Sequence, residues 1–211
     1  MARNNSAKGN FHYNKVEKMN KNFMYNNLAR SNCYASSFAG SNFNFVSFRG
    51  AHFKSCDFYG CTFKGAEFIG TNLKNSKFRH AKFENTIFEE VNLDNVDFRD
   101  AEFKDVIFVG CDLSKCTNMG IDALNITIFD EIPELNISEE LEAAINKAMT
   151  NKYIKASRVL DTKEGKINPV KIYLLEKQFT EEELIKGFND MIEEIDREFH
   201  TLSYLLRFFR G

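Results

Sequence analysis

The chain has 211 residues, a length that permits one large or two small domains. It contains 22 Phe, 5 Cys, 2 Pro and no Trp, and its formal net charge is −2 at pH 7. The charge changes sign along the chain: up to Phe83 there are 13 Lys and Arg against 3 Asp and Glu (+10), and from Glu84 onward 15 against 27 (−12). Because no run of about 18 apolar residues occurs, the sequence excludes a transmembrane helix.

Residues 1–20 are rich in Asn and Lys, and we expect them to form a loose N-terminal cap that is in part disordered. Phe11, Tyr13 and Val16 look out of phase with the repeat that follows, as is typical of the terminal units of a solenoid. The first ten residues have no apolar core of the kind found in a signal peptide. We therefore expect a soluble, cytoplasmic protein.

Residues 21–115 carry a large apolar residue at every fifth position without a change of phase. These 19 positions hold 14 Phe, 4 Leu and one Cys. They are Phe23, Leu28, Cys33, Phe38, Phe43, Phe48, Phe53, Phe58, Phe63, Phe68, Leu73, Phe78, Phe83, Phe88, Leu93, Phe98, Phe103, Phe108 and Leu113. A period of five suits neither an α-helix nor a flat strand, because in both the Phe side chains would point in different directions. The backbone must therefore turn a corner about every five residues, and a coil results.

Two further patterns describe this coil. Leu73, Leu93 and Leu113 recur at every fourth pentapeptide, which indicates four pentapeptides per coil and about 4.75 coils in all. Small or β-branched residues lie two positions before most central residues, where they share a narrow interior with the Phe side chains. Residues that tolerate positive φ often lie two positions after, and we expect them to form the corners: Gly40, Gly50, Gly60, Gly65, Gly70, Asn75, Asn85, Asn95, Asp100, Asp105 and Gly110.

Runs such as 66–70 (Ala-Glu-Phe-Ile-Gly), 71–73 (Thr-Asn-Leu) and 91–93 (Val-Asn-Leu) resemble the pentapeptide repeat family. The resemblance covers about 95 of the 211 residues. It implies a β fold, a right-handed quadrilateral β-helix at residues 21–116, but it does not imply one function. Some members of the family mimic DNA and bind gyrase or topoisomerase.

The five cysteines fit the repeat without a chemical role. Cys56, Cys61, Cys111 and Cys116 occupy the small interior position and Cys33 a central position. We therefore expect buried free thiols in a reducing compartment. Neither closely spaced pair has a nearby His or the spacing of a zinc site, so we expect no metal.

Outward positions of the repeat carry most of its charge. Lys64, Glu84 and Lys104 occupy the same position in three successive coils and predict a ladder of alternating charge on one solvated face. Arg79 and Arg99 should lie one coil apart with His80 beside them, and like charges in that arrangement are unfavourable. They could extend into water or pair with Asp97 and Asp100. The sharper hypothesis is that Arg79, Arg99 and His80 form a candidate partner surface for an anionic protein.

After Cys116 the period stops, because Asn118 stands where a Phe is due. Residues 117–136 are predicted to be a transition and C-terminal cap, and residues 137–211 a mainly α-helical domain. Ser138 before two Glu residues predicts a helix start. The path of residues 153–179 stays open: Tyr153, Ala156 and Leu160 could continue that helix, whereas residues 170–174 alternate like a strand, with a β-hairpin around residues 163–165 as one arrangement.

Thr180 and Glu183 predict a capping box that opens a long final helix over residues 181–209. Its apolar residues are spaced alternately three and four, and we name them the helix-pairing seam: Ile185, Phe188, Ile192, Ile195, Phe199, Leu202, Leu206 and Phe209. The seam could fold back on the helix at 138–150 within one chain or could join two chains in a homodimer. Gly187 inside it could mark a bend.

The sequence carries no phosphate-binding loop, dinucleotide fingerprint, His-Glu-x-x-His or Cys-x-x-Cys motif. We therefore expect no enzyme and no cofactor. We also expect no direct nucleic-acid binding, because Lys and Arg alternate with neutral positions instead of forming a dense patch. The function that fits best is a scaffold or protein–protein interaction module with an unidentified protein partner. The alternative is a DNA-mimic binder of gyrase or topoisomerase, although the basic first half of the repeat and its short length depart from that pattern.

Overall fold

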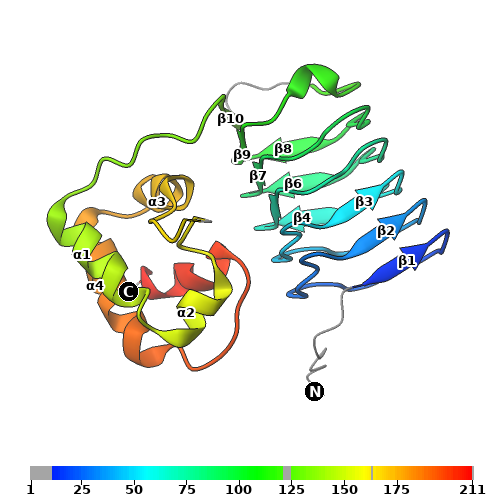
Figure 1. Ribbon diagram of the computed structural model, residues 1–211. Coiled ribbons are helices and arrows are strands. Elements are labelled where there is room, and N and C mark those ends of the chain that lie inside the picture. The colour runs from blue at the N-terminus through cyan, green and yellow to red at the C-terminus, as the bar shows by residue number, and fades with distance from the viewer. Residues whose placement is uncertain (1–10, 121–124, 163, 211) are drawn as a thin grey trace. The chain divides into compact units, whose positions relative to one another are not determined.

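The computed structural model describes residues 11–120, 125–162 and 164–210 (Figure 1). The chain divides into two compact units, Met1–Glu131 and Ile132–Gly211. We call the first the solenoid unit and the second the helical unit, and we describe each by itself.

The solenoid unit is a β-solenoid whose short strands pair in parallel between successive coils (Figure 1). One sheet contains β1 (His12–Asn14), β2 (Asn32–Tyr34) and β3 (His52–Lys54), and a second contains β4 (Thr62–Lys64), β6 (Lys82–Glu84) and β8 (Glu102–Lys104). The third contains β5 (Glu67–Ile69), β7 (Ile87–Glu89), β9 (Val106–Val109) and β10 (Ile126–Phe129). Isolated parallel bridges such as Asp57 with Lys77 and Lys77 with Asp97 connect the coils along the remaining face. Paired residues are separated by four pentapeptides, as Phe63 is from Phe83, which confirms the predicted coil.

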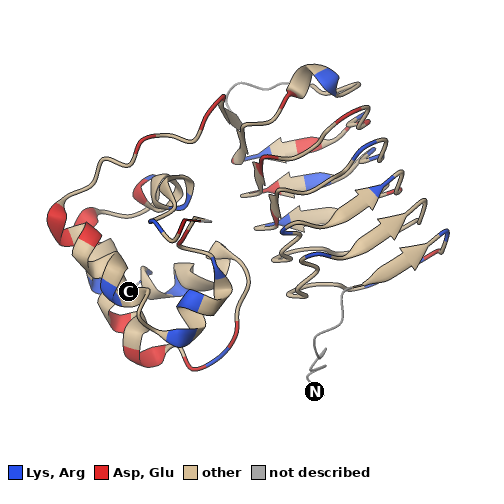
Figure 2. Ribbon diagram, in the orientation of Figure 1, with Lys and Arg blue, Asp and Glu red and all other residues tan. Residues whose placement is uncertain are grey.

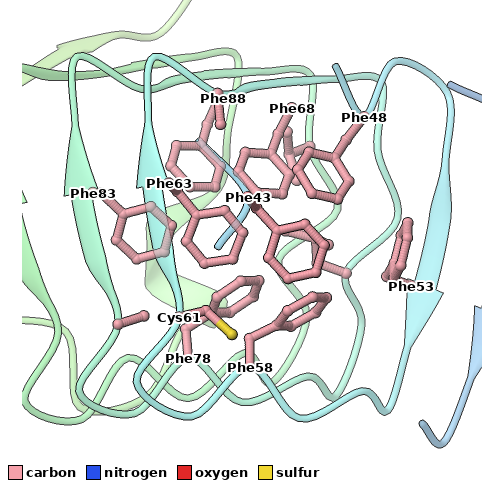
Figure 3. Close-up of a cluster of buried hydrophobic side chains, with 14 of the residues drawn as sticks. Phe43, Phe48, Phe53, Phe58, Cys61, Phe63, Phe68, Phe78, Phe83 and Phe88 are labelled. Carbon is pink, nitrogen blue, oxygen red and sulfur yellow. The ribbon is translucent and has the colours of Figure 1, made fainter. Parts of the chain in front are cut away.

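The central residues fill the interior as columns of stacked rings (Figure 3). The rings of Phe68 and Phe88 lie 4.7 Å apart at an interplanar angle of 2°, and those of Phe58 and Phe78 lie 4.7 Å apart at 6°. Neighbouring columns meet edge to face, as in the pair of Phe63 and Phe78. Each ring is therefore covered by the coils before and after it, so no coil could bury its own Phe residues.

The small interior positions have a second task, which is to satisfy main-chain carbonyl groups of the preceding coil. Thr71 Oγ1 donates to Phe48 O (2.9 Å), Ser76 Oγ to Phe53 O (2.6 Å) and Cys61 Sγ to Phe38 O (3.1 Å). Ser, Thr and Cys side chains are short enough for the narrow interior, and each has one O–H or S–H group that can donate to a buried carbonyl. The corners that follow adopt positive φ, as at Gly70 (57°) and Asn75 (61°).

Both ends of the solenoid extend further than the sequence predicted. Tyr13 pairs in register with Cys33, so residues 11–20 are part of the first coil and not a loose cap; residues 1–10 lie outside the described residues. At the other end, η1 (Leu113–Lys115) lies just before Cys116, and Ile128 of β10 pairs with Phe108, so the solenoid extends beyond Cys116 and includes β10. The solenoid has about six coils instead of 4.75. The prediction failed because the end coils carry Tyr13, Lys18 and Asn118 at central positions, which need not be fully apolar where only one neighbouring coil covers them.

The helical unit contains α1 (Glu139–Ala148), α2 (Lys152–Ser157), α3 (Pro169–Glu176), α4 (Glu181–Glu194) and the 3₁₀-helix η2 (Leu202–Phe208). Four polar side chains cap the N-termini of the α-helices: Ser138, Asn151, Asn168 and Thr180. The capping box of Thr180 and Glu183 is confirmed. The N-terminal ends of α1 and α4 lie together, because Ser138 Oγ donates to Glu181 Oε1 (2.5 Å).

Residues 153–179 form helices on either side of a turn. Asp161 and Ile167 make a single antiparallel bridge, and Thr162 N donates to Lys166 O (2.8 Å), although residue 163 lies outside the described part. The strand-like alternative for residues 170–174 is wrong, because that stretch lies in α3. Asn168 accepts a hydrogen bond from Lys171 N and Pro169 occupies the first turn, two helix-start signals that outweigh a short alternation.

The single long helix expected over residues 181–209 is also wrong. α4 ends at Glu194, Ile195 is extended (φ −80°, ψ 105°), and the chain then turns into η2. Asn151 Nδ2 donates to Ile192 O (2.9 Å) and Ile195 O (3.1 Å). The end of α4 is therefore satisfied by a side chain from another part of the unit, which allows the helix to stop without Gly or Pro.

Candidate functional site

Charged side chains form ordered rows on the outside of the solenoid, since equivalent positions recur once per coil. Lys64 Nζ lies 3.0 Å and Lys104 Nζ 3.5 Å from Glu84 Oε1, which confirms the predicted ladder. The hydrogen bond from Lys64 is the main cause that lowers the pKa of Glu84. These side chains are well exposed, so each pair contributes only a few tenths of a kcal/mol.

The candidate partner surface of Arg79, Arg99 and His80 lies on the face that the isolated bridges connect. Arg79 Nε donates to Asp97 Oδ2 (2.6 Å), and His80 Nε2 lies 3.6 Å from Asp100 Oδ2. The ring of Tyr59 lies 5.1 Å from that of His80. The structure thus brings the three predicted residues together and pairs two of them with acids from the next coil, whereas the side chain of Arg99 is exposed.

Asp97 organises this surface and was not predicted as a site residue. Its side chain is only 12% exposed, and its carboxylate accepts hydrogen bonds from Arg79 Nε, Arg99 N (3.1 Å) and Asn118 Nδ2 (2.9 Å). Burial alone would raise its pKa, but the hydrogen bonds from Asn118 and Arg79 outweigh burial and hold the pKa of Asp97 below its usual range. One signal in the sequence could have indicated this role. Asp97 directly precedes the central residue Phe98, in the coil that follows the coil of Arg79.

The seam residues contribute to the core of the helical unit itself. Phe188, Ile195, Phe199, Leu202 and Phe209 are buried there, and Ile185, Ile192 and Leu206 pack against them in part. The rings of Phe188 and Phe209 lie 5.1 Å apart. A Cβ atom on Gly187 would lie 2.2 Å from Phe209 Cδ1, so this glycine allows a close approach between α4 and Phe209.

The cysteine thiols are not activated. All five are free, and burial raises the pKa of Cys33 to about 11 and of Cys56, Cys61 and Cys116 to about 12. A protonated, buried thiol is a poor nucleophile. Over residues 11–120, 125–162 and 164–210, no group of three or more His, Cys, Asp or Glu side chains is placed to hold a metal ion.

The helical unit has an open pocket of about 490 Å³, which Met149, Ile154 and Leu160 line together with Lys155 and Asp161. Asp161 Oδ1 accepts a hydrogen bond from Arg158 Nε (2.7 Å), so its carboxylate already has a partner. No helix in the described part of the chain is both long and apolar enough to cross a membrane.

The parallel coils of stacked central residues define the solenoid unit as a β-solenoid built from five-residue units. The family model described as "Pentapeptide repeat region" matches residues 35–104. The solenoid unit is therefore a pentapeptide repeat domain.

Several solved structures of low identity are similar to parts of this chain. HetL, a pentapeptide repeat protein involved in heterocyst differentiation regulation from the cyanobacterium Nostoc, is 19% identical over 49% of this chain and 46% of its own, with a TM-score of 0.43. Rfr23 from the cyanobacterium Cyanothece is 15% identical over 47% and 88%, with a TM-score of 0.33. A structure of QnrB1, a plasmid-mediated fluoroquinolone resistance protein, is 14% identical over 57% and 88%, also with a TM-score of 0.33. The match thus spans less than half of HetL, and no curated protein matches the sequence.

Proposed function

We propose that this protein is a non-enzymatic scaffold that binds a protein partner through the outer surface of its solenoid unit. The observation that supports this most is the fixed position of Arg79, whose Nε is held 2.6 Å from Asp97 while Asp97 is itself held by Asn118 and the main chain of Arg99. A side chain that is already ordered loses little conformational entropy when a partner binds.

The composition of this surface fits a protein interface. Tyr59 is 50% exposed beside His80, and Arg99 extends from the same face. Tyr and Arg are the residue types that most often dominate the binding energy of interfaces. Since Asp97 partly neutralises Arg79, the exposed Arg99 is the residue that we expect to meet an anionic group of the partner. We assign the protein to the cytoplasm, where its five free thiols would stay reduced.

The DNA-mimic alternative lacks an observation in its favour. A duplex presents negative charge along its whole length. In Figure 2 the acidic residues are concentrated in the later coils of the solenoid, while the few charged residues of the first coils are mainly Lys and Arg. A gyrase supercoiling assay with the purified chain distinguishes the two functions, because a scaffold of this kind should leave supercoiling unchanged.

The direct test is to purify the natural chain, Arg99→Glu and Lys54→Glu by affinity from cells that make the protein. Quantitative mass spectrometry then identifies the proteins recovered with each of the three. Lys54 is the matched control because it lies on the β1–β2–β3 sheet and undergoes the same change of charge. We expect one protein to be recovered with the natural chain and with Lys54→Glu but to be lost with Arg99→Glu. Equal recovery with both variants would contradict the assignment of this face.

A further inference from the structure

We propose that the corner of Tyr25 and Phe45 on the first coils is a stacking platform for single-stranded nucleic acid. The rings of Tyr25 and Phe45 lie 5.1 Å apart at an interplanar angle of 10°. Tyr25 is 67% exposed, more than any other exposed large hydrophobic residue in the described part of the chain. This platform is separate from the surface around Arg99 and does not depend on the proposed scaffold function.

The backbone at this corner is costly for aromatic side chains. Tyr25 has φ of 64° and Phe45 has φ of 60°, in the left-handed region that bulky residues rarely adopt. The three equivalent corners of the later coils carry Gly65, Asn85 and Asp105, residue types that suit this region. Because the solenoid forms the same corner with better-suited residues, the fold does not require two aromatic rings here. Strained positions that a fold does not need are typical of functional sites.

The electrostatic surroundings favour an anionic ligand. No Asp or Glu occurs between Glu17 and Asp57, whereas Lys18, Lys21, Arg30, Arg49 and Lys54 lie within that stretch. Figure 2 shows that Asp and Glu are few in the first coils compared with the later ones. Lys21 and Arg30 are exposed and lie four residues before and five residues after Tyr25, one on each side of the platform along the coil. Aromatic rings that stack on bases, flanked by cations that contact phosphates, are the usual basis of single-strand binding without sequence preference.

Asparagine side chains two or three residues from Tyr25 or Phe45 in sequence add hydrogen-bond donors. Asn22 Oδ1 accepts from Met24 N (3.1 Å), Asn27 Oδ1 from Ala29 N (3.0 Å) and Asn42 Oδ1 from Asn44 N (2.9 Å). Because the oxygen of each amide bonds its own backbone, the amide nitrogen is directed away from that bond and can donate to a phosphate or a base edge. The sequence alone shows no dense basic patch and therefore gave no reason to expect nucleic-acid binding. The new evidence is the aromatic pair, because Tyr25 and Phe45 are brought together only by the register of successive coils.

The test is fluorescence anisotropy of the full chain with a labelled oligothymidylate and a labelled oligouridylate, at low salt and then with added salt. The double variant Tyr25→Asn with Phe45→Asn removes both rings but keeps the fold, since Asn occupies this corner at Asn85. We expect the natural chain to bind both oligonucleotides with an affinity that falls as salt is added. The affinity of the double variant should be lower by about tenfold or more, because base stacking on the rings is lost. Tyr34→Asn, at a tyrosine that is 48% exposed on β2, is the matched control and should bind as the natural chain does.

Thermal unfolding separates this role from a purely structural one. Because Asn tolerates positive φ, the double variant should unfold at the same or a higher temperature than the natural chain. Three results would overturn the proposal: no binding of either oligonucleotide at low salt, unchanged affinity in the double variant, or an equal loss in Tyr34→Asn. Binding of neutral oligosaccharides in place of both oligonucleotides would also overturn it and would assign the platform to a carbohydrate ligand.

Discussion

Replacing Phe78 by Ala should be among the most damaging changes in the solenoid. The side chain is fully buried and lies between the stacked rings of Phe58 (4.7 Å) and Phe98 (5.5 Å). It also meets the edges or faces of Phe63 (5.6 Å) and Phe83 (5.6 Å). Coils on both sides hold these four rings in place, so the site cannot collapse around the cavity. We therefore expect the variant to lower the free energy of unfolding by about 3 to 5 kcal/mol.

Two comparisons give this prediction its specificity. Phe78→Leu should cost less than about 1.5 kcal/mol, because Leu73 and Leu93 already occupy equivalent central positions. Phe103→Ala should cost less than Phe78→Ala, because Phe103 is only partly buried near the end of the solenoid. The measurement is guanidinium unfolding followed by far-ultraviolet circular dichroism. Equal losses for Phe78→Ala and Phe103→Ala would refute the argument that each ring depends on both neighbouring coils.

Three further predictions concern the hydrogen bonds of Asp97, the close packing of Gly187 against Phe209, and the cysteine thiols. Asp97→Asn should lower the free energy of unfolding by about 1 to 3 kcal/mol at neutral pH. The pKa of Asp97 is depressed in the folded state, so its stabilising effect is present above the unfolded pKa of about 3.9 and is lost as the pH falls through the folded value. When the free energy of unfolding is measured against pH, it should therefore decrease less on acidification in the variant than in the natural chain. Gly187→Ala should destabilise the helical unit by about 1 to 3 kcal/mol, because the new Cβ would meet Phe209; a gain of about 1 kcal/mol, the usual result in an open helix, would show that Phe209 does not pack there. A thiol-specific dye should react slowly with the native chain at neutral pH and rapidly after denaturation, because burial raises the pKa of the cysteines; fast reaction of the native chain would contradict the buried positions of Cys33, Cys56 and Cys61.

The period of five was sufficient to predict the coil, because a central Phe must point inward wherever the chain turns every fifth residue. The register of Phe68 with Phe88 and the ladder through Glu84 both follow from that one rule. The ends were missed for a physical reason. In the described part of the chain, Tyr13 and Ile128 have a neighbouring coil on one side only, so a fully buried Phe is not needed there and the sequence pattern fades.

The helical unit shows the opposite case, a clear pattern with a wrong interpretation. The spacing from Ile185 to Phe209 suits one helix, yet residues in an extended segment and in a 3₁₀-helix can face the same core as α4. What stops the helix is Asn151, which lies far earlier in the sequence, through its bonds to Ile192 O and Ile195 O. Contacts of this kind leave no local signal. For the same reason Asp97 was considered only as an ion-pair partner of the arginines and not as a site residue, since its further bond to Asn118 comes from another coil.

The claim that this protein acts by binding through the solenoid face around Arg99 is tested most directly by photocrosslinking in living cells. A benzophenone amino acid would replace Tyr59, which lies beside His80 on this face, in one variant and Tyr34, on β2, in another, so that Arg99 is kept in both. We predict a covalent adduct with one protein of defined mass from position 59 and none from position 34. Equal adducts from both positions, or none from position 59 while the partner still copurifies with that variant, would contradict the account.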